Sequence, residues 1–158
     1  MPDIPPDMMT RDRPVDPHFA DDEILYRRFR PEDFDGGEVA PEAFELPDMS
    51  VNRQKYGPPK WLLLDEAFAH WGVAGFRVED IPRDREMLHA GVIAYVLRPE
   101  HAPEKHNYPH SEVRIFCDGI HICRDQRNLH LLEPEFHLRW REHLSMASRV
   151  AIPPKDVG

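Results

Sequence analysis

The chain has 158 residues, a formal net charge of −9 and a pI near 5.5. This acidity argues against nonspecific binding to nucleic acid or to anionic membranes, since both require a basic protein surface. No apolar run approaches the ~20 residues of a membrane span. The acidic, proline-rich start does not resemble a secretory signal, and two cysteines do not make a disulfide framework. We therefore expect a cytoplasmic protein with no membrane contact.

Composition divides the chain into three parts. Residues 1–20 hold five prolines among Asp and Arg residues, which predicts a disordered proline-rich tail with little to bury. Residues 21–153 carry the apolar patterns of a single folded domain, and residues 154–158 are expected to form a C-terminal tail. The domain is expected to begin with a strand through Phe29 that ends before Pro31.

The middle of the chain predicts an extended piece at residues 49–51, a helix at 59–71 and a strand at 73–78. Apolar side chains recur at helical spacing in the helix and are expected in the core: Trp61, Leu64, Phe68 and Trp71. Residues 91–97 are continuously apolar, which is typical of a central strand covered on both faces.

Residues 106–123 hold most of the chemically capable side chains. Asp118-Gly119 suits a two-residue type I′ turn, which predicts a hairpin with Phe116 opposite His121. Faces alternate along a strand, so one face is expected to be core: Val113, Ile115, Cys117, Ile120 and Ile122. The other face is the best candidate site: His110, Glu112, Arg114, Phe116, His121 and Cys123.

The C-terminal region predicts a second helix over 134–148 and a last strand over 149–152. The apolar side of that helix is formed by four residues: Phe136, Trp140, Leu144 and Ala147. The predicted fold class is α+β: a single domain with a mixed or antiparallel sheet of four to six strands and two main helices.

Two groups of residues have spacings that suggest a metal. His106, His110 and Glu112 are close in sequence, but Pro109 interrupts the helical spacing that would align the two rings. Cys117, His121 and Cys123 are also close, but the hairpin register turns Cys117 away. The hairpin then supplies at most two ligands, whereas a structural zinc needs about four. No metal site is predicted.

Glu112 and Arg114 share a face and allow two interpretations. They form either a solvated surface ion pair or, if Glu112 faces a cleft beside His110, part of a general-base site. A Ser/His nucleophile pair at 110–111 is not expected, because Ser111 points to the core. Neither Ser50 nor Ser111 lies in the glycine pattern of a nucleophile elbow.

Several motifs together resemble a pattern found in small bacterial proteins of uncharacterised function. The motifs are Leu25–Arg28, Ala43-Phe44, Ser50–Tyr56, Gly72–Ala74 and Asn107–Val113. The resemblance covers roughly residues 22–152, where the structural signals begin and end, and implies no activity.

A weaker resemblance is to the Arg-Ser-Glu class of ADP-ribosyltransferases, through Arg27, Ser50 and Glu112 in that order. In that family the Arg and Ser help to hold NAD, and the Glu orients a ribose hydroxyl and stabilises the oxocarbenium-like transition state. The resemblance thus implies Arg27 and Glu112 as active-site residues, with His110 beside the carboxylate. The family's Ser-Thr-Ser run is absent after Ser50, and His110 stands where a Glu or Gln is usual.

The leading hypothesis is an accessory or partner-binding protein with no cofactor. Its contact patch combines arginine, aromatic and polar residues: Tyr26, Arg28, Ser50, Arg114, Phe116 and His121. The alternative is an NAD-dependent enzyme, favoured if Arg27, Ser50 and Glu112 converge on one concave pocket. The sequence does not specify a partner, a substrate, an oligomeric state or a genomic context.

Overall fold

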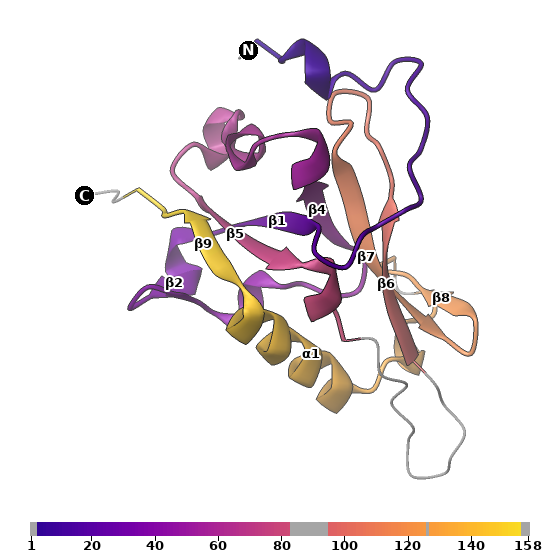
Figure 1. Cartoon of the computed structure of the whole chain (residues 1–158). Helices are drawn as coiled ribbons and strands as arrows, with labels where there is room; N and C mark the ends of the chain where they lie inside the picture. The colour runs from indigo at the N-terminus through magenta and orange to yellow at the C-terminus, as the bar shows by residue number, and fades with distance from the viewer. Residues whose placement is uncertain (1–2, 83–94, 126, 156–158) are drawn as a thin grey trace.

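The computed structural model describes residues 3–82, 95–125 and 127–155 (Figure 1). These residues form an α+β fold with a seven-stranded antiparallel sheet in the order β6-β7-β4-β1-β5-β9, and β8 pairs with β7. The sheet strands are β1 (Ile24–Phe29), β4 (Met49–Arg53), β5 (Gly72–Arg77), β6 (Tyr95–His101), β7 (His110–Cys117), β8 (Ile120–Ile122) and β9 (Arg149–Ile152). A separate ribbon consists of β2 (Phe34–Asp35) and β3 (Glu38–Val39).

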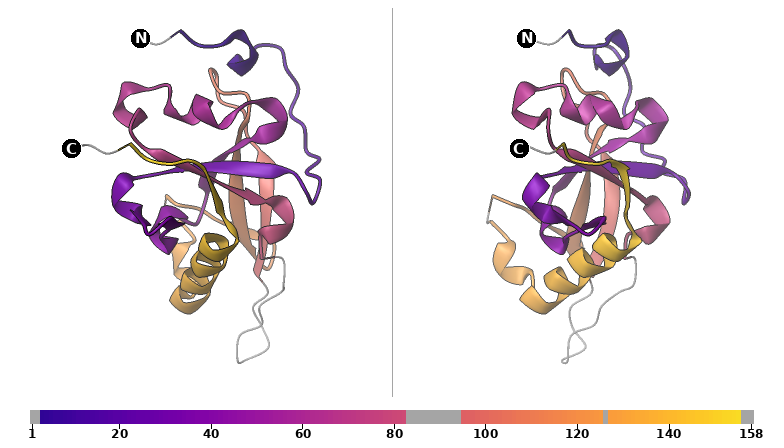
Figure 2. Two further views of the ribbon diagram at one scale, coloured as in Figure 1. Left: turned by 60° about the vertical axis from the view of Figure 1, so that its left-hand side comes forward. Right: turned by 90° about the vertical axis from the view of Figure 1, so that its left-hand side faces the viewer.

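The sheet is strongly twisted, so that β6 and β7 run nearly across β1 and β5 in Figure 1. Strand β7 pairs with β6 along one edge. Its other edge is divided, because residues 110–113 pair with β4 and residues 115–117 pair with β8. The start of β4 therefore meets the end of β8. The views of Figure 2 show the same crossing of strands from the side.

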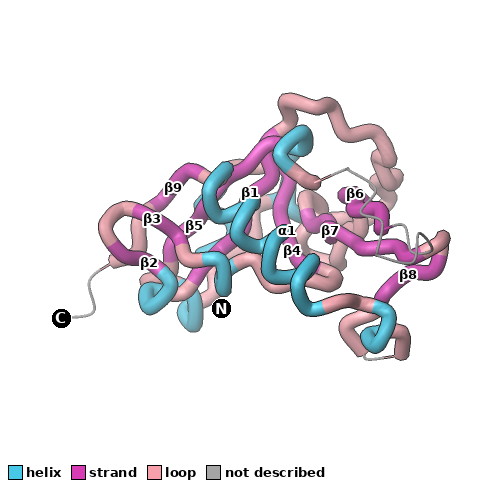
Figure 3. Tube along the Cα trace, turned by 90° about the horizontal axis from the view of Figure 1, so that it is seen from below, coloured by secondary structure: helices cyan, strands magenta, loops and turns pink. Residues whose placement is uncertain are grey.

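Helix α1 (Pro134–Ala147) covers one face of the sheet (Figure 3). Pro134 occupies the first turn, where its missing N–H costs nothing. Phe136, Trp140 and Leu144 are buried, as their spacing predicts, whereas Met146 on the far side is 87% exposed. The sheet contributes the other half of the core through alternate residues: Leu25, Phe29, Met49, Val51, Phe76, Leu97, Val113 and Ile115.

The hairpin prediction is confirmed in its turn and register. Asp118 and Gly119 both have positive φ, 49° and 82°, and Phe116 lies opposite His121. Cys117 is buried on the core face and Cys123 is not part of that face. One predicted core residue is wrong: Ile120 is 49% exposed, because it directly follows the turn at the end of the hairpin.

Three element predictions are corrected. The described residues contain one α-helix rather than two, because residues 59–71 form short 3₁₀ helices at Pro59–Leu63 and Glu66–Phe68. Asp65 accepts a hydrogen bond from the N–H of Ala67 and so starts a new turn. The aromatic stripe of this region is only half-buried. The sheet has seven strands rather than four to six.

Strand β6 does not have the central position in the sheet that the sequence predicted. It lies at the edge of the sheet, paired on one side with β7. Residues 91–94 of the predicted strand lie outside the described residues. Among the described residues no helix has the length and apolar character of a membrane span.

The N-terminal segment, residues 3–20, packs on the domain instead of forming a free tail. Met8 is buried, and its carbonyl accepts a hydrogen bond from the N–H of Tyr108 at 2.7 Å. The Tyr108 hydroxyl donates to the carbonyl of Pro14, and the guanidinium of Arg13 lies 3.5 Å from the Tyr108 ring centroid. The segment has few apolar groups, but these are sufficient to hold it on the domain because polar groups of the domain also bind its backbone.

Short 3₁₀ helices connect many of the other elements. They are Pro6–Met8, Pro31–Asp33, Pro41–Ala43, Gln54–Tyr56, Val78–Asp80 and Leu129–Leu131. Several begin with proline, which supplies the φ angle of a first turn and has no N–H to satisfy.

Candidate functional site

The face of the sheet opposite α1 is polar, and it carries the contact residues expected from the sequence. Because Leu25, Val51 and Ile115 point into the core, their strand neighbours point to this second face. It therefore holds Tyr26, Arg28, Ser50, His110, Glu112, Arg114, Phe116 and His121.

Arg27 lies where strands β1 and β4 diverge. The two strands pair only at Leu25 and Tyr26 of β1, and beyond that point the Arg27 guanidinium occupies the opening. Its Nε donates to the carbonyl of Ala43 at 2.9 Å, and its Nη1 donates to the carbonyl of Ser50 at 3.0 Å. Burial lowers the pKa of Arg27 to about 10, so the side chain still carries its charge at neutral pH.

Two adjoining hollows, with volumes of about 340 and 250 Å³, share Arg27, Arg28 and Ser50. We call them together the arginine cleft. The larger hollow adds further charged and aromatic residues: Arg30, Asp33, Glu42, Glu45, Phe68, Trp71 and Arg124. The smaller adds mainly polar residues: Asn52, Leu62, Glu104, Asn107 and His110.

Arg28 is the second cation of the arginine cleft. Its Nη1 donates to the carbonyl of Leu62 at 3.2 Å, and its guanidinium lies 3.6 Å from the ring centroid of Phe68. Burial lowers its pKa, against the opposing influence of the Asp65 and Glu104 charges. Among the described residues, neither Arg27 nor Arg28 forms an ion pair with a carboxylate. The cleft thus holds two arginines that form no ion pair, together with Arg30, Arg124 and the carboxylates of its lining.

Ser50 and His110 form a hydroxyl–imidazole pair beside these cations. The His110 Nδ1 lies 2.7 Å from the carbonyl of Ala102, which only accepts, so Nδ1 carries a proton. Nε2 lies 3.2 Å from the Ser50 hydroxyl and 2.9 Å from a carboxylate oxygen of Glu104. A neutral ring accepts from Ser50, whereas a protonated ring donates to Glu104. No pattern in the sequence predicts this pair, since it depends on the pairing of β4 with β7.

Glu112 lies on the same face but outside the lining of the arginine cleft. Arg114 donates to it at 2.8 Å and to Glu100 at 3.0 Å. Burial lowers the pKa of Arg114, but the contacts with Glu112 and Glu100 outweigh it and the pKa is raised. The Arg98 guanidinium lies over the ring of Phe116, 4.0 Å from its centroid. Glu112 is therefore held in an ion-pair network rather than free as a base.

Asn52 and Asn107 support the smaller hollow. Each side-chain amide donates to the other's oxygen, at 3.1 and 2.8 Å, which joins β4 to the loop before β7. Asn107 belongs to one of the sequence motifs named above, but no pattern in the sequence pairs it with Asn52.

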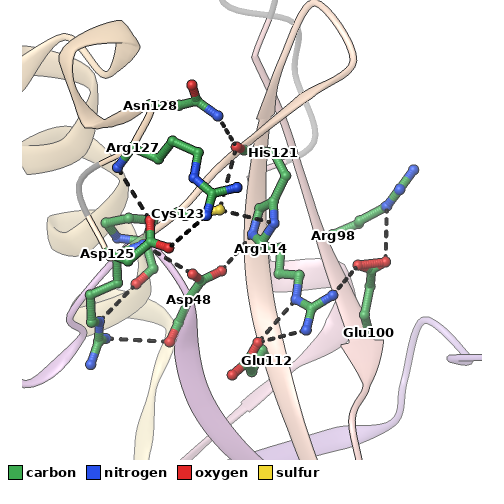
Figure 4. A network of polar contacts seen from close by, with 12 residues as sticks. Asp48, Arg98, Glu100, Glu112, Arg114, His121, Cys123, Asp125, Arg127 and Asn128 are labelled. Carbon is green, nitrogen blue, oxygen red and sulfur yellow. Dashed lines mark hydrogen bonds and ion pairs between the residues drawn. The ribbon is translucent and has the colours of Figure 1, made fainter.

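One group of potential metal ligands exists among the described residues: Asp48, His121 and Cys123. Figure 4 shows these side chains with their hydrogen bonds. His121 lies 2.7 Å from Asp48 through Nε2 and 3.5 Å from Cys123 through Nδ1. Asp48 and Cys123 lie beside opposite nitrogens of the His121 ring. An ion bound to Nε2 would therefore have Asp48 beside it, and an ion bound to Nδ1 would have Cys123 beside it. As expected from the register, Cys117 is not a member.

No protein-family model, curated protein or solved structure matches this chain. Of the residues predicted from the sequence, the structure brings Arg27, Arg28, Ser50 and His110 together in one cleft. Glu112 and Arg114 lie in the adjacent ion-pair network, and His121 lies in the cluster with Asp48.

Proposed function

We propose that this is an accessory, partner-binding protein that holds an oxyanion group of its partner, a phosphate or a carboxylate, in the arginine cleft. The observation that carries the proposal is the partly buried cation Arg27, whose hydrogen bonds go to backbone carbonyls and not to a carboxylate. A partly buried charge that forms no ion pair is costly, and a bound anion reduces that cost.

The neighbouring groups support this assignment. Arg28 is fixed by Leu62 and Phe68, so little conformational freedom remains to be lost on binding. Guanidinium groups bind phosphate and carboxylate in bidentate geometry. When His110 is protonated and donates to Glu104, the Ser50 hydroxyl of the same cleft is free to act as a further donor.

The proposal is tested by calorimetric titration of the protein with inorganic phosphate, pyrophosphate and citrate at two ionic strengths. We expect binding that weakens with salt, and a loss of about tenfold in affinity, equivalent to 1.4 kcal/mol, in Arg28→Met. Methionine retains an apolar stem against Phe68. Arg77→Met is the matched control, because Arg77 is an exposed arginine outside the arginine cleft. If none of these anions binds, or if both variants bind alike, the proposal is wrong.

The alternative function is an NAD-dependent transferase, and one observation favours it. Arg27 and Ser50 line the same cleft, as the resemblance to ADP-ribosyltransferases requires. The pairing of Glu112 with Arg114 counts against it. Titration with NAD, followed by an assay of NAD hydrolysis, separates the two functions. Hydrolysis that Glu112→Gln abolishes without loss of NAD binding would replace the accessory role with an enzymatic one.

A further inference from the structure

A second cluster of reactive side chains lies where β8 replaces β4 along the edge of β7. Asp48 directly precedes β4, His121 lies in β8, and Cys123 follows β8. The divided edge of β7 therefore brings a loop carboxylate beside an imidazole and a thiol (Figure 4). Asp48 lies 73 positions from His121 in the chain, whereas Cys123 lies two positions from it.

The distances place the three side chains in the order thiol, imidazole, carboxylate. Cys123 Sγ lies 3.5 Å from His121 Nδ1, and His121 Nε2 lies 2.7 Å from Asp48 Oδ1. An ionised carboxylate only accepts, so Nε2 carries the ring proton. In the neutral ring, Nδ1 then presents its lone pair to the thiol. A nucleophile, its base and a group that orients the base stand in this order in catalytic triads.

Neighbouring contacts hold the carboxylate in position. The N–H of Arg124 donates to Asp48 Oδ2 at 3.1 Å, which leaves Oδ1 to His121. The Arg124 guanidinium donates to the carbonyls of Glu45, Pro47 and Asp48, and so fixes the loop. Asp48 itself has a positive φ of 57°, an uncommon conformation outside glycine.

Among the residues that the structure describes, the thiol has one competing acceptor. Cys123 Sγ lies 3.7 Å from the carbonyl of His121, which already accepts a hydrogen bond from the Asn128 amide at 3.0 Å. His121 Nδ1 is the nearer acceptor. The His121 side chain is 31% exposed and Cys123 is partly exposed, so a small reagent can reach the sulfur.

We propose that Cys123 is a nucleophile for activated acyl groups, such as esters and thioesters, with His121 as its base and Asp48 as the residue that positions the ring. The sulfur attacks the carbonyl carbon and forms a C–S bond, while the thiol proton passes to His121 Nδ1. The bond to the leaving oxygen or sulfur breaks, and the leaving group takes the electron pair and then a proton from the imidazolium. Water attacks the acyl-cysteine in the same way, releasing the acid and restoring the thiol.

This site does not depend on the proposed anion-binding function. Cys123, His121 and Asp48 do not line the arginine cleft, although Arg124, which fixes the Asp48 loop, also lines its larger hollow. Cys117 provides an internal reference for the chemistry. Cys117 is buried on the core side, and burial raises the pKa of its thiol. One cysteine of the chain thus stands beside a base, and the other stands in an apolar environment.

The test uses the full-length protein and p-nitrophenyl acetate. We expect release of p-nitrophenolate and a single acetyl group, located on Cys123 by peptide mass spectrometry. The rate is expected to exceed that of the denatured chain by about a hundredfold, and His121→Phe or His121→Gln should remove that advantage. Asp48→Asn should reduce it less and move the pH profile of acetylation to lower pH, because the imidazolium loses the carboxylate that stabilises it and the neutral base persists at lower pH.

Cys117→Ser is the matched control and should acetylate at the rate of the unaltered protein. Thermal melting of each variant separates loss of fold from loss of reactivity. Acetylation of Cys123 at the denatured-chain rate would overturn the proposal, as would a rate that neither His121 variant changes. Stoichiometric binding of Zn²⁺ that is lost in Cys123→Ser, together with slow acetylation, would instead assign the cluster to a metal.

Discussion

Arg53 is the residue on which the packing of the N-terminal segment depends. Its side chain is fully buried, yet each of its three side-chain nitrogens donates a hydrogen bond. It donates to both carboxylate oxygens of Glu23, at 2.7 and 2.8 Å, and to the carbonyls of Asp16 and His18. The ring of Phe19 lies 3.8 Å from its guanidinium. One buried cation therefore organises several residues that the sequence alone presents as a tail.

Replacing Arg53 by methionine should destabilise the protein by about 3–5 kcal/mol, because it leaves the Glu23 carboxylate buried without its partner. The measurement is urea denaturation followed by circular dichroism. The double variant Arg53→Met/Glu23→Met should recover part of the loss, since no unpaired charge remains. Arg77→Met, at an exposed ion pair, should stay within about 0.5 kcal/mol of the unaltered protein. An equally small effect at Arg53 would contradict this role.

At the scale of elements, local signals predicted the hairpin and helix α1 correctly. Asp118-Gly119 fixes the turn and hence the register, and Trp140 lies in a strict helical pattern. Trp61 and Phe68 also lie at helical spacing, but Asp65 accepts a backbone hydrogen bond between them and starts a new turn. Helical spacing without a packing partner was therefore not enough to form an α-helix here.

The candidate sites were harder to predict from the sequence than the helices and strands. Ser50 meets His110, and Asp48 meets His121, only through the pairing of β7 with both β4 and β8. Strand pairing between distant segments has no local signature comparable to a turn or a helical period. The sequence identified the polar face of the hairpin and missed its partners from β4.

Deletion of residues 1–20 should lower the free energy of unfolding by at least about 3 kcal/mol, because Met8 loses its burial and Arg53 loses two carbonyl acceptors. For a domain of this size that corresponds to a fall in Tm of roughly 6–12 °C. Differential scanning calorimetry measures it. Deletion of residues 1–4 is the control and should change little, since Ile4 is 39% exposed. An unchanged Tm in the longer deletion would instead support the prediction that residues 1–20 form a disordered tail.

At the scale of the whole molecule, several groups prefer their deprotonated form in the folded state. Burial lowers the pKa of His101, whose Nδ1 accepts a hydrogen bond from the N–H of Asp16. Burial and the nearby charge of Arg141 lower the pKa of His137. The hydrogen bonds from Tyr56 and Lys55 hold the pKa of Asp16 well below its usual range. All three shifts act in the same direction on stability.

The protein should therefore lose stability steadily on acidification. The unfolded chain binds protons to histidine near pH 6.5, whereas His101 and His137 bind them only at lower pH, so unfolding takes up protons as the pH falls. The slope approaches about 1.4 kcal/mol per pH unit for each proton taken up by the unfolded chain alone. Below about pH 4 the Asp16 carboxylate adds to the loss. Urea denaturation at a series of pH values measures this slope between pH 7 and 5, approximate limits that bracket the histidine titration. His101→Gln should flatten it, and His130→Gln, at an exposed histidine, should not. A stability that rises on acidification in this range would show that these imidazoles gain a proton on folding rather than exclude it.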